Sequence, residues 1–138
     1  MATVLIDSNV LLDLITEDQQ WFAWSSAMLA DTAEHSRLVI NPIVYAEISI
    51  RYSRIEDLNA AIPTTLVDRE PVPYEAAFLA GKAFSIYRKR GGKKQSTLPD
   101  FFIGAHASVA GHRLLTRDAA RYRSYFPDLD IISPETHP

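Results

Sequence analysis

The stretch "TVLIDSN", residues 3–9, decides the fold class. Its first four residues are apolar or β-branched, and its last three, Asp7, Ser8 and Asn9, are polar. A short run of the first kind predicts a strand buried on both faces, as in a parallel sheet. The abrupt change to polar residues places Asp7 at the carboxyl end of that strand, where open α/β sheets bind their ligands.

Short strand candidates and helices alternate along the rest of the chain. Besides 3–6, we predict strands at 38–40, 113–116 and 130–132, and a strand or an extended connector at 66–67. Helices are predicted at 9–14, within 18–32, after Asn41-Pro42, and at 55–62, 73–90, 98–110 and 119–125. This alternation predicts a three-layer α/β fold, in which helices cover both faces of a parallel sheet.

Length and composition limit the class of protein. The 138 residues suffice for one domain, predicted to span residues 1–138, and the hydrophobic and charged fractions of 47% and 22% are typical of soluble globular proteins. No apolar run approaches the ~20 residues that span a membrane. A signal peptide begins with basic residues, but no Lys or Arg precedes Arg37 in this sequence. We therefore expect a cytoplasmic protein. The absence of cysteine excludes disulfides and thiolate metal sites.

Four acidic residues occur in matching contexts. Asp118 follows the strand candidate "RLLT" much as Asp7 follows the first strand, while Glu47 and Asp100 lie on apolar helices that would start at the same sheet edge. Each acid has a structural alternative. Asp7 and Asp118 could cap the helices that follow them, Glu47 could pair with Arg51, and Asp100 fits a capping box begun by Thr97.

Carboxylates that converge at one edge repel each other, and a cation resolves that repulsion. Hard oxygen ligands favour Mg²⁺ or Mn²⁺, which can activate water and stabilise an in-line displacement at phosphorus. Histidine chemistry is the alternative, but the four histidines lack metal-ligand spacing, and His106 lies about 120° around its helix from Asp100. Gly104 and Ala107 share the helix face of Asp100, and we expect their small size to leave space for a metal or for backbone.

The ordered set Asp7-Ser8-Asn9, Glu47, Asp100 and Thr116-Arg117-Asp118 resembles the PIN domain, in particular the VapC-type toxins of bacterial toxin–antitoxin pairs. The resemblance runs from "VLIDSNVLLDL" through "LPDFFIGAHA" to "LLTRDAARYRSYFP". It implies a central, mainly parallel five-stranded sheet and a Mg²⁺- or Mn²⁺-dependent endoribonuclease. The resemblance also implies which acids bind the metal and catalyse the reaction, namely Asp7, Glu47, Asp100 and Asp118. Ser8, Asn9 and Thr116 would support them. Asp13 recurs in such openings too, but it stands six residues past the strand end, and we interpret it as structural.

Residues 88–94, "RKRGGKK", hold five of the fourteen basic residues, which are Arg88, Lys89, Arg90, Lys93 and Lys94. The net charge of −3 argues against nucleic-acid binding through bulk positive charge, so RNA binding needs a local basic patch of this kind. The stretch could hold RNA phosphates near the cleavage point, or it could be a solvated helix end that complements the helix dipole.

The predicted helix within 18–32 has a wide apolar face. The side chains of Trp21, Phe22, Trp24, Met28 and Leu29 cover an arc of about 160°, whereas one packed face needs about 100°. Core packing is the commoner explanation for aromatic residues on such a face. The extra width favours a surface that meets a partner, either an antitoxin or a second copy of the chain in a homodimer, and we expect Trp21 or Trp24 to be partly exposed in the isolated chain and covered by that partner.

Three other classes of protein fit the sequence less well. A haloacid-dehalogenase-type phosphatase needs a second Asp after the first strand, and a receiver domain needs a late Lys where Thr116-Arg117-Asp118 stands. A non-catalytic PIN-like module that acts through protein or RNA binding is the remaining alternative. It would be expected to have lost one of the four acids, and none is missing. We therefore predict a nuclease with an RNA substrate and an antitoxin partner.

Overall fold

The computed structural model describes residues 2–91 and 97–138 and shows a five-stranded sheet in the order β3-β2-β1-β4-β5. The strands are β1 (Ala2–Ile6), β2 (Ser36–Ile40), β3 (Asp68–Arg69), β4 (Arg113–Leu115) and β5 (Ile131–Ile132). All four neighbouring pairs are parallel. The predicted α/β class and its parallel five-stranded sheet are therefore confirmed.

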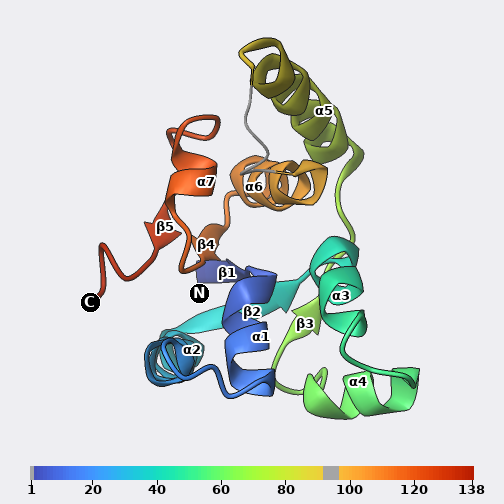
Figure 1. Cartoon of the computed structure of the whole chain (residues 1–138), viewed down its shortest axis with the longest axis vertical. Helices are drawn as coiled ribbons and strands as arrows, with labels where there is room; N and C mark the ends of the chain where they lie inside the picture. Colours follow the sequence, from blue (N-terminus) through green and yellow to red (C-terminus); the bar gives the residue numbers. More distant parts are fainter. Residues whose placement is uncertain (1, 92–96) are drawn as a thin grey trace.

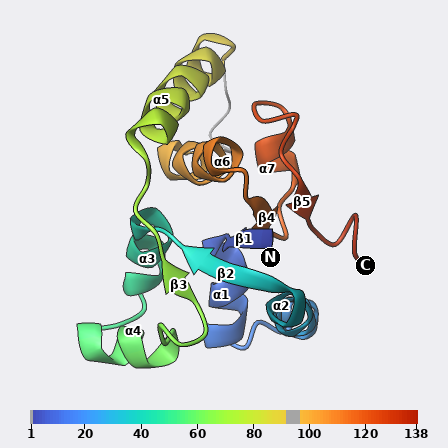
Figure 2. The same ribbon diagram turned by 180° about the vertical axis from the view of Figure 1, so that it is seen from behind.

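Seven helices connect these strands within the described residues. They are α1 (Ser8–Ile15), α2 (Phe22–His35), α3 (Pro42–Ser49), α4 (Ile55–Ala61), α5 (Tyr74–Lys89), α6 (Leu98–Ala110) and α7 (Ala120–Arg123). Helices α1 and α2 lie on one side of the sheet, and α5 and α6 lie on the other (Figures 1 and 2). This arrangement gives the three layers that the alternation of strands and helices predicts.

The central strand β1 determines where the site forms. Its residues Val4, Leu5 and Ile6 are fully buried, because β1 is covered on both faces and paired on both edges. In the register of the sheet, Leu5 lies between Val39 of β2 and Leu114 of β4. The three central strands therefore end close together, and the residues that follow them share one edge of the sheet.

The third strand differs from the sequence prediction, which gave residues 66–67 as either a strand or an extended connector. Leu66 is 71% exposed, and its amide donates to the carbonyl of Pro63 in a turn. The strand is instead formed by Asp68 and Arg69, whose backbone pairs with the end of β2. An edge strand can be polar, because main-chain hydrogen bonds hold it and one side faces solvent. The side chain of Arg37 in β2 adds an ion pair to Asp68 at 2.7 Å.

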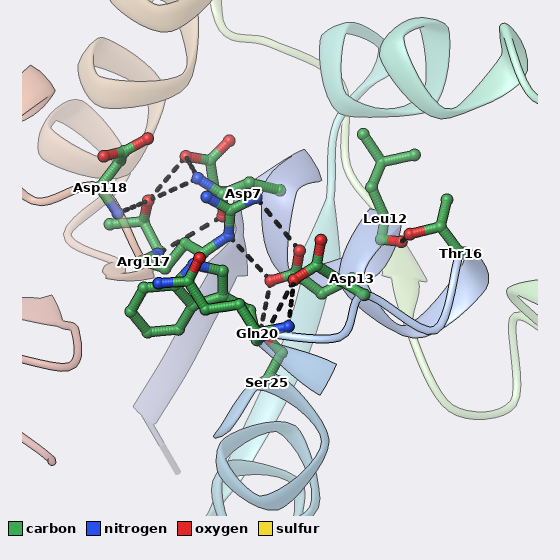
Figure 3. Close-up of polar contacts among 12 residues, drawn as sticks. Asp7, Leu12, Asp13, Thr16, Gln20, Ser25, Arg117 and Asp118 are labelled. Atoms are coloured by element: carbon green, nitrogen blue, oxygen red, sulfur yellow. Dashed lines mark hydrogen bonds and ion pairs between the residues drawn. The ribbon is translucent and has the colours of Figure 1, made fainter. Parts of the chain in front are cut away.

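A partly buried ion pair and a buried hydrogen bond meet at Asp13 and join α1 to the loop after β4 and to α2. The Asp13 carboxylate of α1 is 2% exposed and accepts hydrogen bonds from Ser25 Oγ of α2 at 2.7 Å and from Arg117 Nε at 2.9 Å. Figure 3 shows Ser25 and Arg117 reaching Asp13 from different sides. Because both oxygens of Asp13 have partners inside the fold, the structure supports the structural interpretation of this acid.

Candidate metal centre

Asp7 follows β1 and is only 3% exposed. It occupies the N-cap position of α1, but its side chain makes no capping hydrogen bond, so the capping alternative does not account for it. Its Oδ2 atom accepts hydrogen bonds from Thr116 Oγ1 at 2.8 Å and from the hydroxyl of Tyr122 at 2.7 Å, with Asn9 Nδ2 farther away at 3.4 Å. Among the described residues, Asp7 is thus held in place by neutral donors rather than by a basic partner.

Glu47 reaches the same edge from α3, which starts at Pro42 after the end of β2. Its Oε1 atom accepts a hydrogen bond of 2.9 Å from Ser8 Oγ, the residue that follows Asp7. Within the described part of the chain, no ion pair joins Glu47 to Arg51, so the structural alternative for Glu47 fails. Ser8 therefore links the half-buried Glu47 to the end of β1.

Asp100 divides its two oxygens between two surroundings. Its Oδ2 atom accepts a hydrogen bond of 2.9 Å from the backbone N–H of Thr97, which closes the predicted capping box at the start of α6. Its Oδ1 atom lies 3.7 Å from Arg121 Nη1. The predicted capping role of Asp100 is confirmed, and it uses Oδ2, so Oδ1 takes no part in the capping box.

Asp118 is partly exposed, with a side chain that is 39% accessible. The N-cap position of α7 is Ala119, so the Asp118 side chain does not cap that helix. Its Oδ2 atom lies 3.4 Å from Arg121 Nε. One guanidinium group, that of Arg121, thus lies close to both Asp100 and Asp118.

The electrostatics of the cluster favour a cation. Burial raises the pKa of Asp7 even though hydrogen bonds from Tyr122 and Thr116 oppose the shift, and the charge of Asp100 raises it further. Burial also raises the pKa of Glu47, and the charges of Asp7 and Asp100 add to the effect. Each acid would therefore be stabilised by a positive charge placed among them. Arg121 already supplies one at the exposed side of the group.

The donor set of this cluster suits a hard divalent cation. The acids, the hydroxyls of Ser8 and Thr116, and the side-chain amide of Asn9 offer oxygen ligands, and no imidazole lies among their hydrogen-bond partners in the described residues. Oxygen-rich sites of this kind select Mg²⁺ or Mn²⁺ over the softer transition metals. The residues therefore fit the metal that the sequence predicts.

A second polar cluster is formed by Glu70, His106 and His112, and none of the four acids belongs to it. Glu70 Oε1 is 2.8 Å from His106 Nε2 and 2.6 Å from His112 Nε2. Asn41 Oδ1 accepts the amide of Val44, so Asn41 turns its NH₂ group to His106 Nδ1 at 3.0 Å. In neutral His106 the ring proton is then on Nε2 and points at Glu70, where a metal ligand would need a lone pair. His106 is fully engaged in this network, which argues against its role as a catalytic base.

The space beside Gly104 is filled, contrary to the expectation that small residues leave room there for a metal. A Cβ atom on Gly104 would lie 2.6 Å from Phe126 Cε2 and 3.0 Å from Tyr122 Cδ1. Two aromatic side chains from the segment after β4 thus pack against α6 at this point. The sequence pattern did not reveal Tyr122, which donates to Asp7. The available signal was weak: a buried tyrosine usually finds a partner for its hydroxyl.

The basic stretch is only partly within the described residues. Arg88, Lys89 and Arg90 are exposed at the end of α5, whereas Lys93 and Lys94 lie outside the described residues. The guanidinium of Arg90 lies 6.0 Å from the centre of the Tyr125 ring. Since Tyr125 follows α7, this contact brings the basic end of α5 next to the segment that carries Tyr122.

The aromatic residues at the start of α2 are partly exposed, as expected for Trp21 and Trp24. The two rings meet edge to face at 6.3 Å, and Trp24 Nε1 donates to the carbonyl of His137 at 2.7 Å. The guanidinium of Arg117 lies 5.7 Å from the centre of the Trp21 ring. Part of the wide apolar arc is therefore covered by the chain itself, while Phe22 remains 39% exposed.

Comparison with known proteins assigns the chain to one family. The PIN domain family model matches residues 4–126, so the chain belongs to the PIN domain family. Similar solved structures include VapBC2 from Rickettsia felis bound to a promoter DNA fragment, at 16% identity and a TM-score of 0.72, covering 95% of this chain and 98% of that chain. VapBC-1 from nontypeable Haemophilus influenzae has 20% identity and a TM-score of 0.71, covering 95% and 97%. A toxin-antitoxin complex from Klebsiella pneumoniae has 19% identity and a TM-score of 0.62, also covering 95% and 97%.

At these identities the solved structures establish a shared fold. No curated protein sequence matches the chain. Among residues 2–91 and 97–138, no helix has both the length and the apolar character needed to cross a bilayer.

Proposed function

We propose that the chain is a metal-dependent endoribonuclease that acts in the cytoplasm as the toxin of a toxin–antitoxin pair. One observation carries the proposal: Asp7, Glu47, Asp100 and Asp118 lie at the carboxyl edge of the sheet, and no buried basic residue among those described neutralises them. Membership of the PIN domain family and the likeness to a toxin-antitoxin complex support it. The alternative of a non-catalytic module is less favoured, because all four acids are present.

In this proposal the four acids hold Mg²⁺, or Mn²⁺ as its substitute. When bound, the ion lowers the pKa of water and offsets the charge that develops on the phosphate. Ser8 orients Glu47 through its hydroxyl, and Thr116 and Asn9 orient Asp7 through Oδ2. These contacts hold the ligand oxygens in place before a substrate arrives, which limits reorganisation during the reaction.

RNA binding is assigned to the basic end of α5. We propose that Arg88, Lys89 and Arg90, together with Lys93 and Lys94, contact phosphates on either side of the cleavage point. Phosphate contacts position a nucleic acid without reading its sequence, so this stretch supplies affinity rather than sequence specificity. The antitoxin and a second copy of the chain are the proposed protein partners, and the exposed Phe22 with Trp21 and Trp24 is the proposed contact.

The test is cleavage of total RNA by the purified full chain with Mg²⁺, with Mn²⁺ and with excess EDTA. In-line attack by water should leave a 5′-phosphate and a 3′-hydroxyl at each cut, and EDTA should abolish cleavage. Asp7→Asn should be inactive, whereas Asp128→Asn, which changes an exposed acid in a loop, should cleave as the parent does. A 2′,3′-cyclic phosphate product, or full activity in EDTA, would exclude this mechanism.

A further inference from the structure

We propose that Tyr122 is a positioning residue that fixes the Asp7 carboxylate, so that Oδ1 faces the cation while Oδ2 is held by the protein. The inference rests on the proposed metal site and adds a residue to it. Tyr122 lies in α7 and is fully buried, and its hydroxyl is 2.7 Å from Asp7 Oδ2. It is 115 residues from Asp7 in the chain, so only the fold brings them together.

The two oxygens of Asp7 have unequal surroundings. Oδ2 accepts short hydrogen bonds from Tyr122 at 2.7 Å and from Thr116 at 2.8 Å, which occupy its two lone pairs, while Asn9 Nδ2 lies farther away at 3.4 Å. Oδ1 is approached by Ser8 Oγ at 3.5 Å, but the single hydroxyl proton of Ser8 has a shorter path to Glu47, at 2.9 Å. Oδ1 has only this long side-chain contact, so it is the oxygen with more room for a ligand, and the difference between the two oxygens comes from the short hydrogen bonds on Oδ2.

An aspartate carboxylate does not hold its own orientation, because the torsion that rotates it is broad and roughly two-fold. Donors outside the ligand shell set that torsion and the direction of the free lone pairs. Thr116 Oγ1 is itself fixed by the Asp118 amide at 3.0 Å and by Asn9 at 3.3 Å, but it supplies a single short hydrogen bond to Oδ2, about which the carboxylate can still turn. A second donor on the opposite lone pair of Oδ2 locks the carboxylate plane.

The position of the Tyr122 hydroxyl is set by packing and not by Asp7. The ring lies against α6 at Gly104, where a Cβ atom would be 3.0 Å from Tyr122 Cδ1. Phe126, one turn further along, presses on the same glycine. Because packing fixes the ring, the hydroxyl oxygen of Tyr122 is also fixed, and only the hydroxyl hydrogen can still rotate. The glycine and the two aromatic residues together bring a donor from α7 to the end of β1.

Tyr122→Phe tests this inference, because it removes the hydroxyl and keeps the ring. We expect Mn²⁺ binding, measured from the electron paramagnetic resonance signal of free Mn²⁺, to weaken about 10- to 100-fold, the usual effect of losing a partner of a metal ligand. For RNA cleavage, kcat should fall while KM for RNA stays at the parental value. Tyr125→Phe, the same change three residues along in an aromatic cluster around Phe101, should leave both unchanged.

Asp7→Asn in the same titration separates this inference from the function on which it rests. If the parent binds no Mn²⁺, the proposed metal site itself fails. If Asp7→Asn loses Mn²⁺ while Tyr122→Phe keeps parental affinity, the site stands and the role of Tyr122 is overturned. Should Tyr122→Phe not fold, Thr116→Val and Thr116→Ser remove and keep the other donor to Oδ2. Equal Mn²⁺ affinity in these two variants would also overturn the inference.

Discussion

The Asp7 side chain is buried as an acid with no basic partner among the described residues, and this is an unfavourable state in the absence of metal. Burial raises its pKa above the usual value of 3.8, and the nearby charge of Asp100 acts in the same direction. Tyr122 and Thr116 recover part of the lost solvation through their hydrogen bonds. A cation bound next to Asp7 would therefore stabilise its ionised carboxylate.

Replacing Asp7 with Asn should stabilise the metal-free protein at neutral pH, by about 1 kcal/mol. An acid with a raised folded pKa contributes stability that is full below its unfolded pKa and is lost as pH rises through the folded pKa. The parent should therefore lose stability as pH rises above 3.8 through that window, and the variant should lose less. Thermal melting in EDTA from pH 4 to pH 8, about the range over which the parent's loss develops, measures the difference.

Bound metal should reverse the order of thermal stability of the parent and of Asp7→Asn. Saturating Mn²⁺ should raise the melting temperature of the parent more than that of Asp7→Asn, because a ligand that binds the folded state more tightly stabilises it more. Asp128→Asn serves as the control and should follow the parent in both conditions. Equal rises in the parent and in Asp7→Asn would mean that Asp7 does not bind the ion.

Single residues of the site could be predicted where their sequence context was unusual. Asp7 and Asp118 follow strands, and Glu47 and Asp100 interrupt apolar helices, which is visible in the sequence alone. Tyr122 could not be predicted, because its role depends on a hydrogen bond across 115 residues that no local pattern encodes.

Helix α7 has only four residues, and its placement depends on the packing of its neighbours against α6. Phe126 and Tyr122 approach Gly104 so closely that no side chain fits between them and the helix. Phe126 and Phe101 of α6 extend this contact with ring centres 6.3 Å apart. Because the same segment carries Asp118, the packing of one short helix positions both an acid and a donor of the site.

Gly104→Ala should therefore damage the site from a distance. The added Cβ would lie 2.6 Å from Phe126 Cε2, and such overpacking costs about 1–3 kcal/mol and moves the aromatic residues outward. Gly81→Ala in α5 is the matched control, since no atom of the described residues lies within 4 Å of its added Cβ. Without a clash, Ala in a helix interior stabilises by roughly 0.5–1 kcal/mol relative to Gly.

Chemical denaturation and Mn²⁺ titration of the two glycine variants provide the measurement. Gly104→Ala should unfold at lower denaturant and bind Mn²⁺ more weakly, while Gly81→Ala should unfold at slightly higher denaturant and bind as the parent does. A stable Gly104→Ala protein with parental Mn²⁺ affinity would show that α7 tolerates displacement.

Elements with clear local signals were predicted well. Helix α6 begins at Leu98 and ends at Ala110 as predicted, because a capping box opens it and Gly111, with φ of 71°, closes it. Strand β3 was not located, because the apolar pair Leu66-Val67 suggested a short strand or an extended connector there. The actual strand is polar and owes its position to the backbone of β2, a partner that the local sequence does not reveal.

The molecule as a whole carries a net charge of −3, so RNA must be attracted by a local positive region. Arg88, Lys89 and Arg90 provide one at the end of α5, on the same side of the sheet as α6 (Figures 1 and 2). Helix α4 lies at the other end of the molecule in both views. The end of α5, which we expect to bind RNA, can therefore be compared with the region of α4, which we expect not to bind it.

Arg88→Gln combined with Arg90→Gln should weaken RNA binding and flatten its dependence on salt. For single-stranded RNA, the slope of log affinity against log salt should fall by about 0.7 for every phosphate that the variant no longer neutralises. Arg51→Gln combined with Arg54→Gln, which removes the same charge near α4, should leave the slope unchanged. Filter binding across a salt series measures both. If the slope is unchanged in the Arg88 and Arg90 variant, these arginines do not contact RNA phosphates and only complement the dipole at the end of α5.

The order of the strands also governs when the proposed site could first assemble. During synthesis β1 emerges well before β4, its partner on one side in the sheet, because helices α1 to α6 and strands β2 and β3 lie between them in the chain. Until then Asp7 has neither Thr116 nor Tyr122 beside it, and Asp100 and Asp118 have no fixed place relative to it. The proposed metal site can therefore assemble, and in the proposed function RNA cleavage can begin, only after the segment that carries β4 and α7 has left the ribosome.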